Sequence, residues 1–142
     1  MQTEKYTIEK DIKVFCVKAL SFPEGIQESY EKMKKIISIA PHQKYYGISY
    51  PVDGQIMYMT AVAEVAEGES EMMVEKHGCV AFTIRAGEYA SVLVPDYKAD
   101  TSKISAMFDE LLKGPDILPD GYCLEEFYED SEDLLCLVPL KP

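Results

Sequence analysis

The clearest fold signal in this chain is a predicted hairpin at residues 44–65, KYYGISYPVDGQIMYMTAVAEV. Both arms are rich in β-branched and aromatic residues, which are typical of strands. Between the arms stands Asp53-Gly54, a dipeptide that strongly favours a tight turn between antiparallel strands. The stretch therefore predicts two paired strands, at 44–51 and 55–65.

The residues before this hairpin predict a strand followed by a helix. Residues 12–20, IKVFCVKAL, have the composition of a strand. After them, Pro23 suits the first turn of a helix, and Pro41 ends it. An apolar stripe with helical spacing runs between the two prolines, through Ile26, Tyr30, Met33 and Ile37.

The same order of elements returns in the second half of the chain. Residues 79–97 predict one or two strands with a bend at Ala86-Gly87. A helix capped by Asp100 or Thr101 follows, and its apolar face consists of Ile104, Met107, Phe108, Leu111 and Leu112. A second hairpin then pairs GYCLEEFYED, at 121–130, with LLCLVPLKP, at 134–142.

Together the halves predict an α+β fold with two pseudo-symmetric βαββ units, at about 6–66 and 78–140, in a single domain spanning 1–142. We expect an antiparallel sheet with helices on one face and an open groove on the other. The acidic stretch around 67–75 separates the halves and predicts a mobile connector.

The charge of the chain argues against nucleic acid as a partner. The sequence has 14 basic and 25 acidic residues, a net charge of −11, whereas binding to phosphates needs a basic surface. No apolar run approaches the roughly 18 residues of a transmembrane helix, so we expect no membrane partner. Such a negative field favours cationic ligands or basic proteins.

The cysteines and histidines predict neither disulfides nor a metal site. The four cysteines form no CxxC pair and lie in apolar segments, so we expect buried, reduced thiols in a cytoplasmic protein. The two histidines, His42 and His77, lie far apart in turn-like segments. We therefore expect no metal and no cofactor.

The segment at 121–130 places carboxylates among apolar residues. Strand residues alternate between faces, so one face shows Glu126 and the other Glu125. A carboxylate in such surroundings either reaches solvent at a sheet edge or sits in a pocket that raises its pKa. The pattern alone leaves both readings open.

Tyrosine usage adds a second candidate feature, since the chain has ten tyrosines and no tryptophan. Each tyrosine alone is explained as a strand former whose hydroxyl reaches water. Tyr46, Tyr50, Tyr122 and Tyr128, however, share the parity of Glu126 on the hairpin strands. We expect these side chains to line one concave face together.

A face of this kind favours lipophilic cations. A cation 4 Å from a carboxylate gains about 4 kcal/mol at an effective dielectric of 20, and each aromatic ring adds roughly 0.5–2 kcal/mol. Burial of the charges opposes this gain, and the penalty is largest for compact, strongly hydrated ammonium ions. Large delocalised or quaternary cations also bring apolar area into contact.

Two short motifs resemble those of a known family. The I-x-A-G-x-Y step at Ile84–Tyr89 and the E-x-Y step at Glu126–Tyr128 resemble the GyrI-like small-molecule-binding domain, the effector-binding domain of AraC-type and MerR-type multidrug-responsive regulators. The resemblance extends over about residues 6–140. It implies a groove between duplicated βαββ units, with Glu126 as the pocket carboxylate and Tyr46, Tyr50 and Tyr89 as groove lining. Glu125 competes with Glu126, because one register slip exchanges the two.

The resemblance predicts a binding protein that stands alone. The regulators attach a DNA-binding module, and we expect none here, because only about a dozen residues precede the first predicted strand. We expect a hydrophobic, cationic or aromatic small molecule in a groove formed by Glu126, Tyr128 and the other tyrosines, with no catalytic residue assigned. Two alternatives stay open. One is a hydrolase of reactive, cyclopropane-type molecules that uses the pocket glutamate, and the other is an acidic protein-interaction module similar to a gyrase inhibitor. The sequence leaves the oligomeric state undetermined.

Overall fold

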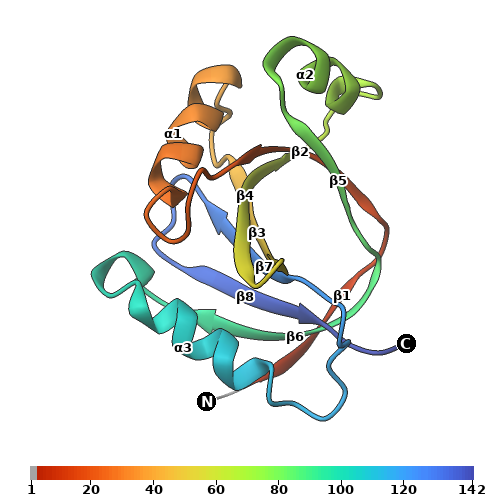
Figure 1. The fold of residues 1–142 in the computed structure, drawn as a ribbon, viewed down its shortest axis with the longest axis vertical. Coiled ribbons are helices and arrows are strands. Elements are labelled where there is room, and N and C mark those ends of the chain that lie inside the picture. The colour runs from red at the N-terminus through yellow and green to blue at the C-terminus, as the bar shows by residue number, and fades with distance from the viewer. Residues whose placement is uncertain (1–2) are drawn as a thin grey trace.

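A single curled antiparallel sheet with helices outside it forms the computed structural model, which describes residues 3–142 (Figure 1). The strands are β1 (Glu4–Ile8), β2 (Ile12–Lys18), β3 (Lys44–Val52), β4 (Gln55–Ala63), β5 (Val80–Ile84), β6 (Gly87–Val94), β7 (Cys123–Tyr128) and β8 (Leu134–Pro139). Their order across the sheet is β1-β6-β8-β7-β3-β4-β2-β5. The helices are α1 (Ile26–Ile36), α2 (Glu69–His77) and α3 (Ser102–Leu111), and a 3₁₀ turn, η1, spans Tyr97–Ala99. This architecture confirms the predicted α+β class.

The two predicted hairpins meet at the middle of the sheet. β3 and β4 are joined by Asp53 and Gly54, both with positive φ, as a tight hairpin turn requires. β7 and β8 form the second hairpin, and β7 pairs with β3 in antiparallel register. This register places Tyr46 opposite Glu126 and Gly47 opposite Glu125. The two halves are thus joined where the sequence places its carboxylates.

Two elements lie outside the predicted pattern. Residues 4–8 form β1, which pairs with β6 at the edge of the sheet. The acidic stretch forms α2 in place of a mobile connector. Ser70 and Met73 are buried on one side of α2, while acidic residues occupy its exposed side. α2 contacts β2 and β5 (Figure 1). Within residues 3–142, no helix has both the length and the apolar character to cross a bilayer.

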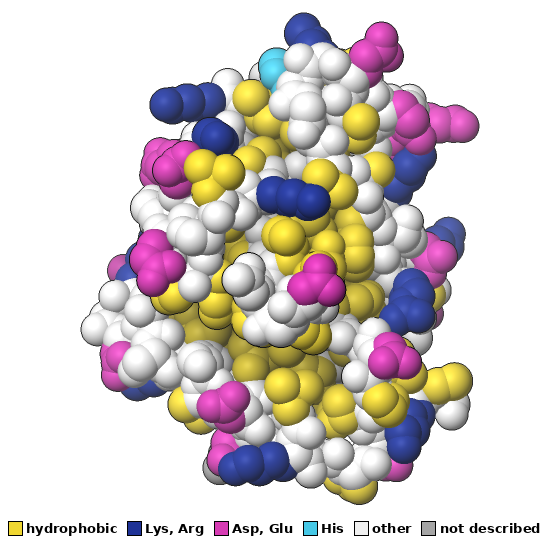
Figure 2. Space-filling view, in the orientation of Figure 1, with side chains coloured by type: hydrophobic (Ala, Val, Ile, Leu, Met, Phe, Trp, Pro, Cys, Tyr) yellow, Lys and Arg dark blue, Asp and Glu magenta, His cyan; other side chains and the backbone are white. Residues whose placement is uncertain are grey.

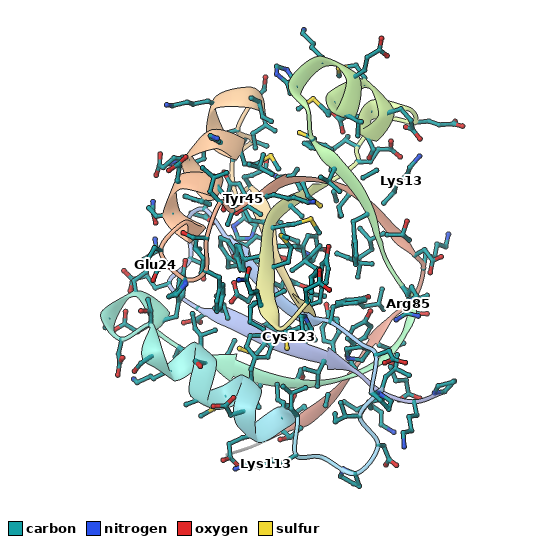
Figure 3. All side chains as sticks on the ribbon, viewed as in Figure 1. Lys13, Glu24, Tyr45, Arg85, Lys113 and Cys123 are labelled. Atoms are coloured by element: carbon teal, nitrogen blue, oxygen red, sulfur yellow. The ribbon has the colours of Figure 1, made fainter. Side chains whose placement is uncertain are left out.

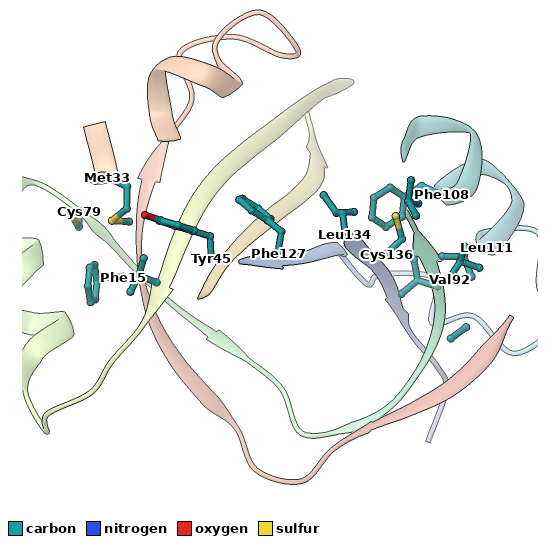
Figure 4. Packing of buried hydrophobic residues seen from close by; sticks show 14 of the residues in the cluster. Phe15, Met33, Tyr45, Cys79, Val92, Phe108, Leu111, Phe127, Leu134 and Cys136 are labelled. Carbon is teal, nitrogen blue, oxygen red and sulfur yellow. The ribbon is translucent and has the colours of Figure 1, made fainter. Parts of the chain in front are cut away.

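The sheet has a core on each face. On the outer face, which the helices cover, the packed side chains run from Met33 of α1 through Tyr45 and Phe127 to Phe108 of α3 (Figure 4). On the inner, concave face a second cluster includes Ile48, Leu124 and Leu137. Strand alternation thus assigns each residue of β3 and β7 to one of two environments.

The inner core yields a stability prediction. Leu137 on β8 is fully buried, whereas Leu93 on the neighbouring β6 is 56% exposed. Leu137→Ala should lower the free energy of unfolding by about 2–5 kcal/mol, because it removes buried methyl groups and leaves a cavity. Leu93→Ala, the matched control, should change it by less than about 0.5 kcal/mol. Urea denaturation measures both, and equal losses would contradict the assignment of this core.

Candidate functional site

Two neighbouring carboxylates on β7 point to opposite faces of the sheet. Glu125 shares the outer face with Cys123 and Phe127, on the side of the helices. Glu126 shares the inner face with Leu124 and Tyr128. The two acids therefore meet entirely different neighbours.

Glu125 accepts a hydrogen bond from Tyr58 and lies opposite Gly47. The Tyr58 hydroxyl donates a hydrogen bond of 3.0 Å to Glu125 Oε1. Gly47, opposite Glu125 on β3, leaves room for both groups. A Cβ at this position would collide with the Tyr58 hydroxyl and with the Glu125 carboxylate. The missing side chain of Gly47 thus allows the carboxylate and the phenol to meet over the strand.

Burial raises the pKa of the Glu125 carboxyl. Loss of hydration raises its pKa to about 7, although the hydrogen bond from Tyr58 acts in the opposite direction. The pKa of Tyr58 is raised well above its ordinary value, first by burial and then by the negative charge of Glu125. Glu125 is absent from the ion pairs of residues 3–142. It is therefore a desolvated acid that lacks a cationic partner within the described chain.

The surroundings of Glu125 are aromatic. The residue as a whole is half-buried, while its carboxylate is desolvated. Phe22, 43% exposed, lies 6.2 Å from the Tyr58 ring. Burial and then the charges of Glu125 and Glu129 raise the pKa of Tyr97, so this phenol lies within electrostatic reach of both acids.

The surface beside this site is recessed and apolar. Figure 2 shows a hollowed hydrophobic area between the tip of the β3–β4 hairpin and α3. Figure 3, in the same orientation, places Cys123 in that area. Cys123 is half-buried, and burial followed by the charge of Glu125 raises its pKa to about 11. This thiol is therefore protonated at neutral pH and contributes apolar surface.

The six residues predicted as ligand-binding all belong to the inner face, in two groups. Tyr46, Glu126 and Tyr128 form the first group, where Glu126 pairs with Lys44 at 3.4 Å. The second group consists of Tyr50, Tyr89 and Tyr122, together with Phe82.

The second group is tied into the core by hydrogen bonds and ring contacts. The hydroxyls of Tyr89 and Tyr122 lie 2.5 Å apart, and both also bond to the backbone of Arg85. Tyr50 stacks on Phe82 with ring centroids 6.5 Å apart. Tyr46, Tyr89 and Tyr122 are buried. Their role in ligand binding stays a prediction.

Sequence reasoning missed three residues that define the surroundings of these acids, namely Gly47, Tyr58 and Lys44. Gly47 was detectable, because a glycine inside a strand pattern often marks close approach of another group. Tyr58 and Lys44 had no such signal, since their partners come from strands far along the chain.

Two surface hollows lie elsewhere on the molecule. One of about 740 Å³ is lined by Arg85, Tyr89 and Lys141 among others, and one of about 230 Å³ by Tyr122 and residues after α3. Neither includes Glu125 or Glu126 in its lining. We base the candidate site on Glu125, because an uncompensated charge demands a partner more strongly than an open hollow does.

Known structures share this fold at low sequence identity. SAV2435 bound to tetraphenylphosphonium superposes with a TM-score of 0.69 at 12% identity, over 99% of this chain and 94% of that one. An integron cassette protein from the mobile metagenome of Vibrio cholerae gives 0.70 at 11%, over 98% and 95%. A hydrolase from Listeria innocua gives 0.56 at 11%, over 99% and 92%. No protein-family model and no curated protein sequence matches the chain.

The raised pKa of Glu125 predicts a pH-dependent stability. The pKa of the Glu125 carboxyl rises on folding from 4.5 to about 7. Protonation of Glu125 therefore stabilises the folded state relative to the unfolded state. The stabilisation is fully present at pH values below the pKa of Glu125 in the unfolded chain, and it is lost as the pH rises through 7. It adds about 3 kcal/mol to the free energy of unfolding. Relative to the wild type, Glu125→Gln should therefore gain about that much stability between pH 4 and pH 8.

Urea denaturation across this pH range measures the difference, and Tyr58→Phe is the matched control. It removes the hydrogen bond that lowers the pKa of Glu125, so its loss of stability should move to higher pH. A difference between Glu125→Gln and the wild type that stays constant with pH would contradict the assignment.

Proposed function

We propose that this protein binds hydrophobic, cationic small molecules on the outer face of β7, with Glu125 as the counter-ion. The observation that carries the proposal is the desolvated carboxylate itself. It accepts a hydrogen bond from Tyr58 and lacks an ion-pair partner among residues 3–142. A bound cation supplies the missing charge.

Elementary electrostatics selects the kind of cation. A positive charge 4 Å from Glu125 gains about 4 kcal/mol at an effective dielectric of 20. The rings of Phe22 and Tyr97, which are at least partly exposed, offer apolar contact and cation–π attraction of roughly 0.5–2 kcal/mol each. A compact ammonium ion gives up more hydration energy for these terms than a large cation does. A large, delocalised cation loses little hydration and buries apolar area as well.

The fold of SAV2435, seen bound to the lipophilic cation tetraphenylphosphonium, supports the same ligand class for this chain. We further propose that the chain is a GyrI-like domain. The E-x-Y motif then points to Glu126, but Lys44 lies 3.4 Å from that acid, whereas Glu125 has no such partner among residues 3–142. For this reason we assign the ligand to Glu125.

Binding of tetraphenylphosphonium tests the proposal, measured by calorimetry with the wild type, Glu125→Gln and Glu126→Gln. The pair of variants is closely matched, since each removes one charge from adjacent positions of β7. Glu125→Gln should weaken binding at least about tenfold, the equivalent of 1.4 kcal/mol. Glu126→Gln should change it less than about threefold. The reverse pattern would identify Glu126 as the counter-ion, and two unaffected affinities would remove the counter-ion role altogether.

The affinity should also depend on pH. With a pKa of about 7, Glu125 is mostly protonated at pH 6 and mostly ionised at pH 8. Affinity for a permanent cation should therefore rise about tenfold between these pH values, and the rise should vanish in Glu125→Gln. An affinity that is flat with pH in the wild type would contradict the role of Glu125.

Hydrolysis is a second candidate function, and the pKa of Glu125 is the observation that favours it. A carboxylate with a pKa of about 7 is suited to act as a general base, taking a proton from water that attacks an electrophilic carbon. The Listeria innocua hydrolase shares the fold.

Incubation with a strained, cyclopropane-containing electrophile, followed by mass spectrometry, separates turnover from binding. An added mass of one water that disappears in Glu125→Gln would support hydrolysis. An unchanged substrate with saturable binding would leave binding as the function.

A further inference from the structure

The inner face of β3 and β7 already holds a cation. The Lys44 ammonium lies 3.4 Å from Glu126 Oε1. It also lies 5.7 Å from the ring centroid of Tyr46 and 5.4 Å from that of Tyr128. The carboxylate attracts the ammonium by its charge, and the two aromatic rings add cation–π attraction.

The strand register builds this arrangement. Lys44 pairs with Tyr128 and Tyr46 pairs with Glu126, so all four side chains come from adjacent positions of two neighbouring strands. The Glu126 side chain is only 11% exposed. Tyr128 is supported from another side by His42, whose ring stacks on it at 4.2 Å and 13°. His42 in turn contacts Asp130 at 2.5 Å, so one wall of the site is fixed independently of Lys44.

The groups around Lys44 raise the pKa of its ammonium. Burial lowers the pKa of Lys44, but the electrostatic effects of the Tyr46 phenol and the Glu126 carboxylate outweigh burial and raise this pKa above its ordinary value. The pKa of Tyr6, on β1, is raised by burial and by the charge of Glu126. The charge of Glu126 thus affects the pKa values of both Lys44 and Tyr6.

We propose that Glu126, Tyr46 and Tyr128 form a second cation site, specific for primary alkylammonium groups, which the chain's own Lys44 occupies. Removal of this side chain opens the site to external ammonium ions. The inference does not depend on ligand binding at Glu125, which lies on the opposite face of the sheet. The specificity role of Lys44 does rest on the proposed function: Lys44 pairs with Glu126, and Glu125 is left without an ion-pair partner among residues 3–142.

The substitution Lys44→Ala deletes three methylene groups and the ammonium, the equivalent of n-propylammonium. We expect Lys44→Ala to lower the melting temperature and n-propylammonium chloride to restore part of the loss. Lys44→Met is the matched control, because its side chain fills the same space without charge and leaves no room for the probe. The double variant Lys44→Ala/Glu126→Gln should also lose the response, whereas Lys44→Ala/Glu125→Gln should keep it.

The proposal would be overturned if n-propylammonium raised the melting temperature of Lys44→Ala no more than that of the wild type. If Lys44→Ala fails to fold, the wild type and Glu126→Gln provide the test through the titration of the Lys44 Cε resonance. Loss of Glu126 should lower the titration midpoint of Lys44, and an unchanged midpoint would likewise overturn the proposal. If Glu125 proves not to bind a ligand, the melting-temperature shift and the Lys44 titration are unaffected. The two proposals are therefore tested separately.

Discussion

The hydrogen bond between Tyr58 and Glu125 is the interaction on which the account of this protein depends. It is one bond of 3.0 Å to a carboxylate whose hydration the fold has largely removed. A single donor compensates only part of the cost of burying an ionised acid. The folded protein therefore keeps an acid at the edge of protonation near neutral pH, in aromatic surroundings. In the proposed function, a bound cation with little hydration of its own completes the compensation.

The pairing of β3 with β7 gives two adjacent acids opposite surroundings. Alternation along β7 sends Glu125 to the outer face and Glu126 to the inner face. On the outer face, Gly47 opposite Glu125 clears space for Tyr58. On the inner face, Lys44 and two tyrosine rings surround Glu126. Within residues 3–142, one strand pair thus carries a carboxylate with a cationic partner and another without one.

Sequence patterns were sufficient for the elements that depend on local chemistry. The Asp53-Gly54 turn, the apolar stripe through Met33 and the alternation along β7 all follow from near neighbours, and each appears in the structure. β1 and α2 were missed because their stability comes from tertiary contacts, with β6 for the first and with β2 and β5 for the second. The choice between Glu125 and Glu126 depends on Tyr58 and Lys44, whose contacts are set by long-range register. A role for the acidic surface in binding a basic protein stays a prediction.

The most direct measurement is the titration of Glu125 itself, followed through its side-chain carboxyl carbon by NMR with and without a saturating lipophilic cation. We expect a midpoint of about 7 in the free protein and a clearly lower midpoint in the complex, because a bound cation stabilises the ionised form. A midpoint in the ordinary range of glutamate in the free protein, or one that the cation leaves unchanged, would contradict it.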